Sequence, residues 1–425
     1  MRLRLVLSII ICILFFEVSY TQENLNSQLH AIKFVGQKKT SVSYLSKHVE
    51  SQVGASITDS LILQDVQRLK NLSSTGNVNY HIEEVDGKKI LIFDIEEVRT
   101  LLPILNAGGI KNNFWFQVGF TDINWGGKGH NFSGSYLNND NRHSGNIFYR
   151  IPRIKNSNWG VSVAISSWSS LEPLFFDEGT VTYEYGNDGI NLTGIYHFDY
   201  NRNLEFGGTF FVENYERSEE QFSEILVGPD QFRQPKWLGK IGYKENFINS
   251  HFFYLFGFSW SAAYQVVLNS VDQTFFNSIE LETKWFARVK EKGNFAHRLR
   301  VAFATNNDSP FAPFVADSHV NIRGIGNRID RGTAQIILNT EYRHAFVENE
   351  KWGFQGVTFS DIGTWRNPGE ELNQIIDPDQ FRFFFGGGIR LIYNKISGAV
   401  LRIDYAVDIF NTEEKGVVIG LGQYF

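Results

Sequence analysis

The residues best suited to specific chemistry are one arginine and two carboxylates that stand well apart in the sequence. Arg323 lies in a glycine-containing stretch, and Glu341 and Asp361 lie on two later segments in which polar and apolar residues alternate. Side chains of a strand alternate between two faces, so Glu341 faces away from its apolar neighbours and Asp361 shares its face with Phe359. A guanidinium group stays charged and can bind two oxygens at once. A loop folded toward that face would place Arg323 between the two carboxylates.

The motifs that mark an enzyme or a metal centre are missing from the sequence. There is no zinc-protease helix, no phosphate-binding glycine loop and no nucleophile elbow, and the ten histidines are scattered. His197 shares a strand face with Asp199, and Asp317 with His319, but no serine stands at a spacing that would complete either set. The net charge of -6 gives no basic bias toward nucleic acid. We therefore expect no enzymatic activity, no cofactor, no metal ion and no nucleic-acid partner.

The segments that carry the arginine and the carboxylates belong to a long alternating region. Between residues 114 and 425, sixteen segments alternate apolar and polar residues and are separated by turns rich in Gly, Asn, Asp and Pro. In the segment 278–289, apolar residues such as Trp285 share one face and charged residues such as Lys284 share the other. No helical or second-sheet pattern is left to cover the apolar face. The pattern predicts an all-β transmembrane barrel of about sixteen antiparallel strands, with lipid outside and a charged lumen.

The first residues have the pattern of a secretory signal. Arg2 and Arg4 supply positive charge, and Leu5 to Phe16 form an apolar core that is too short to span a bilayer. We expect residues 1–21 to be removed as a signal peptide. The only cysteine, Cys12, lies in the apolar core, so a lipoprotein signal is the alternative. A secreted chain with a lipid-facing β pattern points to the outer membrane of a Gram-negative bacterium.

Residues 28–98 form a smaller unit with a different pattern. A short strand is followed by two stretches with apolar residues at helical spacing and by a hairpin around Asp86–Gly87. The predicted order is β-α-α-β-β, and the whole unit is expected in the periplasm. Residues 99–113 contain Pro103 and Gly108–Gly109 and are expected to be a linker, which places the start of the barrel at residue 114.

Short motifs in the smaller unit follow the order of a known domain family. They are Gly54, Leu61, Asp65, Arg68–Leu69, Thr75–Gly76–Asn77–Val78 and Phe93–Glu97. With these motifs, and with its position directly before a barrel, the unit resembles a polypeptide-transport-associated (POTRA) domain. The chain has one such unit and not a tandem array. An unrelated α+β periplasmic module is the alternative.

Five motifs in the alternating region follow the order of one barrel superfamily. They are Gly119–Gly129, the loop Val320–Gly326 with Ile322, Arg323 and Gly324, the strand motif Phe359–Gly363, Gly386–Arg390 and Leu401–Tyr405. With these motifs the chain resembles the BamA/TamA/FhaC superfamily of outer-membrane proteins. The arginine loop then falls between strands 11 and 12, where the superfamily has it. Ile325 departs from the family pattern, which has an aromatic residue at this position.

The resemblance implies a site and a C-terminal signal. In the family, the loop arginine is held by the equivalents of Glu341 and Asp361, and Phe359 and Gly363 belong to the neighbouring strand motif. Such a triad either braces the barrel or also sets the loop so that the barrel seam works, and the sequence leaves both interpretations open. The C-terminal strand would carry the aromatic assembly signal of outer-membrane barrels, here Gly420, Tyr424 and Phe425.

The function implied by the resemblance is assembly or insertion of outer-membrane proteins, or protein translocation. A barrel closes by pairing its first and last strands, expected here near 114–121 and 416–425. Gly416, Gly420 and Gly422 leave the last strand poor in side-chain packing. Such a seam would open, and its free strand edge would template an incoming strand without any nucleotide.

The partners implied are unfolded outer-membrane or secreted client proteins, the lipid bilayer with its lipopolysaccharide, and accessory outer-membrane lipoproteins. Two alternatives keep the same fold without insertase activity, namely a passive channel and an accessory subunit of a larger translocon. The single POTRA-like unit favours the channel, because it offers little surface to accessory lipoproteins.

Overall fold

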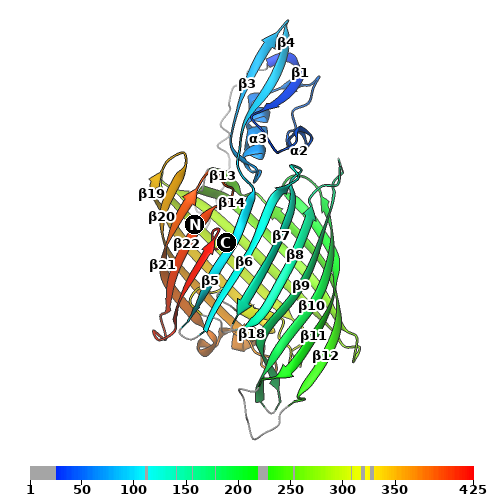
Figure 1. Cartoon of the computed structure of the whole chain (residues 1–425), viewed down its shortest axis with the longest axis vertical. Coiled ribbons are helices and arrows are strands. Elements are labelled where there is room, and N and C mark those ends of the chain that lie inside the picture. Colours follow the sequence, from blue (N-terminus) through cyan, green and yellow to red (C-terminus); the bar gives the residue numbers. More distant parts are fainter. Residues whose placement is uncertain are drawn as a thin grey trace, which may run out of the picture.

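A small domain stands at one end of a β-barrel (Figure 1). The predicted signal segment 1–21 lies outside the described residues, as do Asp317 and His319. The computed structural model describes residues 25–110, 113–139, 141–155, 157–177, 179–218, 228–251, 254–307, 309–316, 321–325 and 330–425.

The small domain combines a four-stranded sheet with helices. Its elements are β1 (Leu25–Val35), α2 (Val42–Leu45), η1 (Ser46–His48), β2 (Ser56–Ile57), α3 (Asp59–Lys70), β3 (Thr75–Val85) and β4 (Lys88–Glu97). The strand order is β2-β1-β4-β3, in which β1 and β4 pair in parallel and β3 and β4 pair antiparallel. The predicted α+β class of this unit is therefore confirmed, and β2 is an addition to the predicted order of elements.

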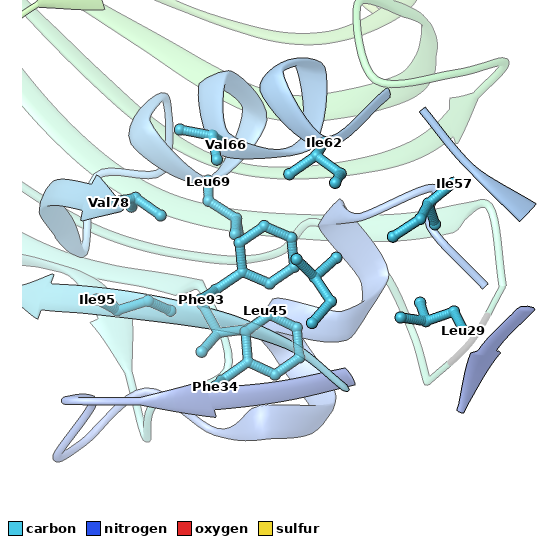
Figure 2. Close-up of a cluster of buried hydrophobic side chains, with 11 residues drawn as sticks. Leu29, Phe34, Leu45, Ile57, Ile62, Val66, Leu69, Val78, Phe93 and Ile95 are labelled. Carbon is cyan, nitrogen blue, oxygen red and sulfur yellow. The ribbon is translucent and has the colours of Figure 1, made fainter. Parts of the chain in front are cut away.

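Helix α3 supplies much of the core of the small domain. Thr58 caps its first turn, because the Thr58 hydroxyl accepts a hydrogen bond from the backbone N–H of Leu61 at 3.3 Å. Ile62, Val66 and Leu69 recur at helical spacing and lie in one buried cluster with β4 (Figure 2). Burial of this apolar face holds the helix against the sheet.

Seventeen further segments form a closed antiparallel barrel. They are β5 (Leu101–Ile110), β6 (Asn113–Trp125), β7 (His130–Asn139), β8 (Arg142–Ile151), β9 (Trp159–Phe176), β10 (Gly179–His197), β11 (Arg202–Arg217), β12 (Gln231–Asn246), β13 (Asn249–His251), β14 (Tyr254–Asn269), β15 (Phe275–Val289), β16 (Gly293–Ala304), β19 (Ala334–Glu348), β20 (Trp352–Arg366), β21 (Arg382–Tyr393), β22 (Val400–Asp408) and β23 (Lys415–Leu421). Because β12 and β13 follow one another along the same partner, β14, the seventeen segments make sixteen strands. The predicted sixteen-stranded fold class is confirmed.

The expected linker at 99–113 is wrong, because most of it is barrel strand β5. This strand pairs with β6 on one side and with β23 on the other. Pro103 lies outside the part of β5 that pairs with β23 and is the register partner of Phe120 in β6. Gly108 packs closely against β23, and an added Cβ would lie 2.9 Å from the carbonyl oxygen of Val417. The barrel therefore begins with β5 and not at residue 114.

The two faces of the barrel wall differ in the way that the alternation predicts. On the outside, Phe258, Ile279 and Trp285 are 45%, 44% and 51% exposed. On the inside, Arg298 and Asn339 are buried, and Arg298 Nε donates a hydrogen bond to Asn339 Oδ1 at 2.9 Å. An apolar outer face around a closed ring is the pattern of an outer-membrane barrel. None of the helices in the described ranges is long and apolar enough to cross a membrane.

The small domain contacts turns at one end of the barrel only. Its contacts join Ser41 to Gly127, Lys47 to Tyr200, Asn71 to Asn249 and Glu96 to Lys395. Counted from β5, these turns follow even-numbered strands, and loops that follow odd-numbered strands open at the other end.

Candidate functional site

The loop between β16 and β19 folds into the lumen from the end opposite the small domain. Counted from β5, β16 is the eleventh strand and β19 the twelfth, which is the position predicted for the arginine loop. The loop spans residues 305–333, of which 308, 317–320 and 326–329 are not described. It contains the short paired strands β17 (Phe314–Ala316) and β18 (Asp330–Gly332). We refer to residues 305–333 as the lumenal loop.

Arg323 of the lumenal loop lies between the two carboxylates that were placed on the inner face. Its Nε and Nη2 donate to the two oxygens of Asp361 at 2.8 and 2.9 Å, and its backbone N–H donates to Asp361 Oδ2 at 2.9 Å. Its Nη1 lies 3.3 Å from Glu341 Oε2. All three side chains are fully buried. The paired hydrogen bonds to Asp361 fix both the position and the orientation of the guanidinium group.

Two residues that sequence reasoning left unassigned complete the ion pairs. Asp404 on β22 lies 3.5 Å from Arg323 Nη1 and accepts a hydrogen bond from Arg390 Nη1 at 2.6 Å. Arg390 on β21 also donates to Glu341 Oε1 at 3.0 Å. Both residues stand in the superfamily motifs quoted above, and alternation places both on the inner face. That inward orientation is the signal by which they could have been found.

The remaining residues of the loop and strand motifs pack together around the arginine. Ile322 is fully buried against Gly363, where an added Cβ would collide with Ile322 Cδ1. Gly324 has a φ of +95°, and an added Cβ there would lie 2.8 and 2.9 Å from side chains of β21 and β22. The ring of Phe359 lies beneath the guanidinium group, with 3.5 Å between its centroid and Arg323 Cζ. The loop thus fits its wall only with glycine at positions 324 and 363.

The buried cluster contains more positive than negative charge. Buried charges are tolerated when each has a partner, and removing one partner leaves the other uncompensated. Five arginines face three carboxylates, an excess of two positive charges. The arginines are Arg298, Arg323, Arg343, Arg390 and Arg402, and the carboxylates are Glu341, Asp361 and Asp404.

The last residues turn into the lumen and cover this cluster. β23 ends just before Gly422, whose φ of +94° redirects the chain. Tyr424 is only 7% exposed, and its ring centroid lies 4.3 Å from Arg323 Cζ. Arg402 Nη1 donates to the carbonyl oxygen of Gly422 at 3.2 Å, and the ring of Phe425 lies near two further arginines of the cluster. Aromatic rings and carbonyl oxygens thus give the arginines partners. The role of Tyr424 and Phe425 as an assembly signal stays a prediction.

The barrel closes between β5 and β23 through a short ladder, which we call the seam. The expected pairing of residues 114–121 with 416–425 is wrong, because β5 lies between them. An added Cβ at Gly420 would meet the ends of the Asn106 and Arg402 side chains, which would have to shift. Four residue pairs join the two strands within the described ranges, which omit residues 111 and 112 just after β5. They are Asn106 with Gly420, Ala107 with Ile419, Gly108 with Val418 and Gly109 with Val417.

The first barrel motif, in the β6–β7 turn, holds the small domain. Asn124 Nδ2 donates to Thr40 Oγ1 at 2.9 Å, and Asn124 Oδ1 accepts from the backbone N–H of Gly129 at 2.8 Å. Lys39 Nζ and Asp122 Oδ2 form an ion pair at 2.7 Å. An added Cβ at Gly129 would collide with the ring of Tyr44. This motif is therefore a joint between the two parts of the molecule.

Two titratable groups of the small domain that lie near this joint have shifted pKa values. Burial acts to raise the pKa of Glu97, but hydrogen bonds from the Thr40 hydroxyl and from three backbone N–H groups hold that pKa below its usual value. Burial lowers the pKa of His48 to about 4, and the positive charge of Arg153 adds to this effect. Glu97 is therefore favoured as the anion and His48 as the neutral ring. No three His, Cys, Asp or Glu side chains of the described residues gather as a metal site would require.

Solved barrels of two kinds resemble this chain along almost its whole length. BamA from Haemophilus ducreyi lacking POTRA domains 1–3 is 16% identical, with a TM-score of 0.54, and the match covers 93% of this chain and 84% of that one. CdiB from Acinetobacter baumannii is 13% identical (TM-score 0.57, 93% and 74% covered). CdiB from Escherichia coli is 10% identical (TM-score 0.60, 93% and 76% covered).

The fold of the chain is that of the BamA and CdiB barrels. The resemblance indicated by the sequence motifs is thus confirmed for the fold. No family model matches the chain, and no curated protein matches it. At these identities, the likeness to solved structures concerns the fold alone.

Proposed function

We propose that this protein assembles or translocates other proteins at the outer membrane, using the seam between β5 and β23 as a lateral gate. The observation that carries the proposal is the weakness of that seam, which has four residue pairs among the described residues and glycine on both strands. Every other neighbouring pair of full-length strands in the described barrel is joined over a longer stretch. The seam is therefore the place where the ring opens at least cost.

Opening the seam exposes the backbone N–H and C=O groups of β5 and β23. A free strand edge binds an extended segment by adding it to the sheet, so an unfolded client would pair with the edge and fold from it. The energy would come from folding of the client, and no nucleotide is required.

The arginine cluster would control how readily the seam opens. The cluster joins the lumenal loop to β19, β20, β21 and β22, and Tyr424 joins it to the residues that follow β23. A strand β23 that moves outward must draw Tyr424 away from Arg323. Of the two interpretations of the triad, this contact supports the one in which it sets the seam as well as bracing the wall.

We assign the small domain as a POTRA domain that lies in the periplasm and receives clients there. Strand β3 is at the edge of its sheet, with β4 as its sheet partner. This edge would accept a client strand by the same backbone pairing. The client is thus expected to be an unfolded outer-membrane or secreted protein, with accessory lipoproteins as further partners.

A disulfide across the seam tests the proposal. Ala107 and Ile419 are register partners in β5 and β23, so cysteines at both positions would lock the seam. Cysteines at Ile403 and Ile419 join register partners in β22 and β23 and are the matched control. The only natural cysteine, Cys12, lies in the predicted signal segment.

Each variant is produced in cells from which the unmodified protein has been depleted. Mass spectrometry of the outer membranes then measures the levels of client proteins. The oxidised seam lock is expected to lower the levels of clients, and its reduced form and the oxidised control should keep them. Unchanged client levels with a fully formed seam disulfide would contradict the lateral gate. Ion conductance without any loss of clients on depletion would favour the passive channel instead.

A further inference from the structure

The outer face of β9, β10, β11 and β12 changes from apolar to polar at one level. Strand register joins the outward residues of these four strands into rows that run across the wall. Three successive rows contain only apolar residues and glycine, and the rows farther from the small domain become polar. The apolar rows are Val161, Gly194, Phe206 and Ile241; Val163, Leu192, Gly208 and Gly239; and Ile165, Ile190, Phe210 and Trp237. The next two rows are Ser167, Asp188, Val212 and Pro235, and then Ser169, Gly186, Asn214 and Arg233. An apolar band that ends at a tryptophan marks the edge of the hydrocarbon.

A groove follows the apolar rows on the outside of the barrel, and we call it the outer groove. Glycine forms its floor. Among the described residues, an added Cβ at Gly208 would meet only the carbonyl oxygen of Leu238, at 3.4 Å, and one at Gly239 would meet nothing within 4 Å. The groove has two parts of about 700 and 620 Å³, and Ile190 and Phe210 line both of them. The outer face of a closed ring lies against hydrocarbon, so the occupant of this groove must be apolar.

The polar end of the outer groove has an arginine without a partner. Arg233 is exposed and forms no hydrogen bond or ion pair with any of the described residues. It lies on the same strand and the same face as Trp237, four residues farther from the small domain, which is about 13 Å at the rise of a strand. Arg233 and Asn214 line a further depression of about 450 Å³. A guanidinium group in this position suits a phosphate, because its planar fork binds two oxygens.

Two carboxylates near this arginine restrict what can bind there. Asp188 lines the outer groove and Glu216 lines the depression around Arg233. Both are exposed, and neither has a hydrogen-bond or ion-pair partner in the described ranges. A phosphate beside two such carboxylates needs a divalent cation, and Mg²⁺ commonly joins carboxylates to phosphates. The charges therefore fit a phosphate that is bound together with its cation.

We propose that the outer groove is a binding site for lipopolysaccharide, with acyl chains along the apolar rows and a phosphate on Arg233. The groove crosses four strands, a width of about 14 Å at the spacing of strands, so more than one acyl chain fits side by side. A lipid with several chains and several phosphates matches both this width and the charges at the polar end. The inference rests on the proposed periplasmic position of the small domain, which puts Arg233 in the outer leaflet, and it does not rest on the gate.

Retention of lipopolysaccharide by the full chain tests the site. Each variant is extracted from outer membranes in a mild detergent, and its folded barrel is identified by the heat-dependent shift on gels. Mass spectrometry then measures the lipopolysaccharide bound per barrel. Gly208→Phe places a ring on the floor of the groove and is expected to lower retention by roughly tenfold, because apolar contacts with the acyl chains are lost.

The matched control for the groove is Gly387→Phe on the outer face of β21. An added Cβ at Gly387 likewise meets only a carbonyl oxygen of the described residues, that of Val357 at 3.4 Å. This variant is expected to keep the retention of the unmodified chain. Equal retention by Gly208→Phe and Gly387→Phe would overturn the proposal.

The charges at the polar end are tested in the same assay. Arg233→Ala should lower retention by roughly tenfold, because hydrogen bonds to a charged phosphate are lost. Chelation of magnesium should also lower it. Arg202→Ala is the control, because Arg202 pairs with Asp199 at the opposite end of β11. Retention that is the same in Arg233→Ala and Arg202→Ala would contradict the assignment of the phosphate to Arg233.

Other occupants of the groove give different results. A photo-crosslinking residue in place of Leu192, which is 60% exposed and lines the groove, should label lipopolysaccharide. Labelling of a protein instead would refute the lipid site. Labelling of phospholipid would refute it as well and would place Arg233 in the inner leaflet, against the proposed position of the small domain. The gate is judged separately, from client levels with the seam lock.

Discussion

The wall made by β9, β10 and β11 differs from the wall around the seam. Strands β9, β10 and β11, which we call the tall wall, have 18, 19 and 16 residues. Strands β22, β23 and β5, which we call the short wall, have 9, 7 and 10. Every ladder bond adds to the cost of separating two strands, so the tall wall resists opening and the short wall does not. The two walls of one barrel thus have different stabilities.

Side-chain contacts support the short wall, which has few backbone hydrogen bonds between its strands. The arginine cluster lies on β19 to β22, directly beside the seam, and the residues after β23 fold onto it. Around β9 and β11 the lumen holds a cavity of about 240 Å³, lined in part by Glu172, Glu213 and Lys236. The short wall is therefore expected to give way first at the seam.

The largest effect on this comparison is expected from Arg323→Ala. It leaves Asp361 buried without the arginine that binds both of its oxygens, and it removes one of the three arginines around Glu341. Removing one partner of a buried pair typically costs about 3–5 kcal/mol. Arg150→Ala on β8 removes a partly exposed ion pair with Glu205 of the tall wall and is expected to cost less than about 1 kcal/mol. Thermal unfolding, followed by the heat-dependent shift of the barrel on gels, measures both. Equal losses would mean that the cluster does not support the short wall.

A smaller effect is expected from a single added methyl group. Gly363→Ala would push a Cβ into Ile322, and overpacking of this kind costs about 1–3 kcal/mol. The control is Gly239→Ala on β12, where no atom lies within 4 Å of the added Cβ and the change should stay within about 0.5 kcal/mol. The same unfolding assay applies, and a Gly363→Ala variant as stable as Gly239→Ala would show that the loop does not sit tightly in its wall.

Period-two alternation predicts which site residues face the lumen. It does not predict at which level along the barrel axis each of them lies. Alternation places Glu341, Asp361, Arg390 and Asp404 on the inner face. It does not tell which inward residues of different strands lie at the same level, because that depends on strand tilt and stagger. Alternation therefore does not identify Arg390 and Asp404 as partners of Arg323 and Glu341, although both stand in superfamily motifs.

The proline and glycine residues of segment 99–113 led to the wrong prediction of a linker at the seam. Pro103 and Gly108 in β5 have the character of a linker, but pairing with strands on both sides outweighs that tendency. The inward turn at Gly422 has no alternation signal, because it depends on arginines of distant strands that attract Tyr424.

The smallest effect is expected at the joint, which contacts the turns after β6 and β10. His48 has a folded pKa of about 4, below the usual 6.5, so its neutral form favours docking of the small domain. The contribution of His48 is complete above about pH 6.5 and is lost as pH falls from there toward 4. Limited proteolysis of residues 41–49 should become faster over this range, and His48→Phe should remove the dependence. A pH response that persists in His48→Phe would assign it to another group.

Hydrogen exchange of the barrel in a lipid bilayer tests the difference between the two walls most directly. We expect the amides of β23 and β5 to exchange much faster than those of β9, β10 and β11, because the seam opens locally while the tall wall stays paired. Arg323→Ala should speed exchange at the seam further and leave the tall wall unchanged. Equal protection all around the ring, or a first opening in the tall wall, would contradict the account.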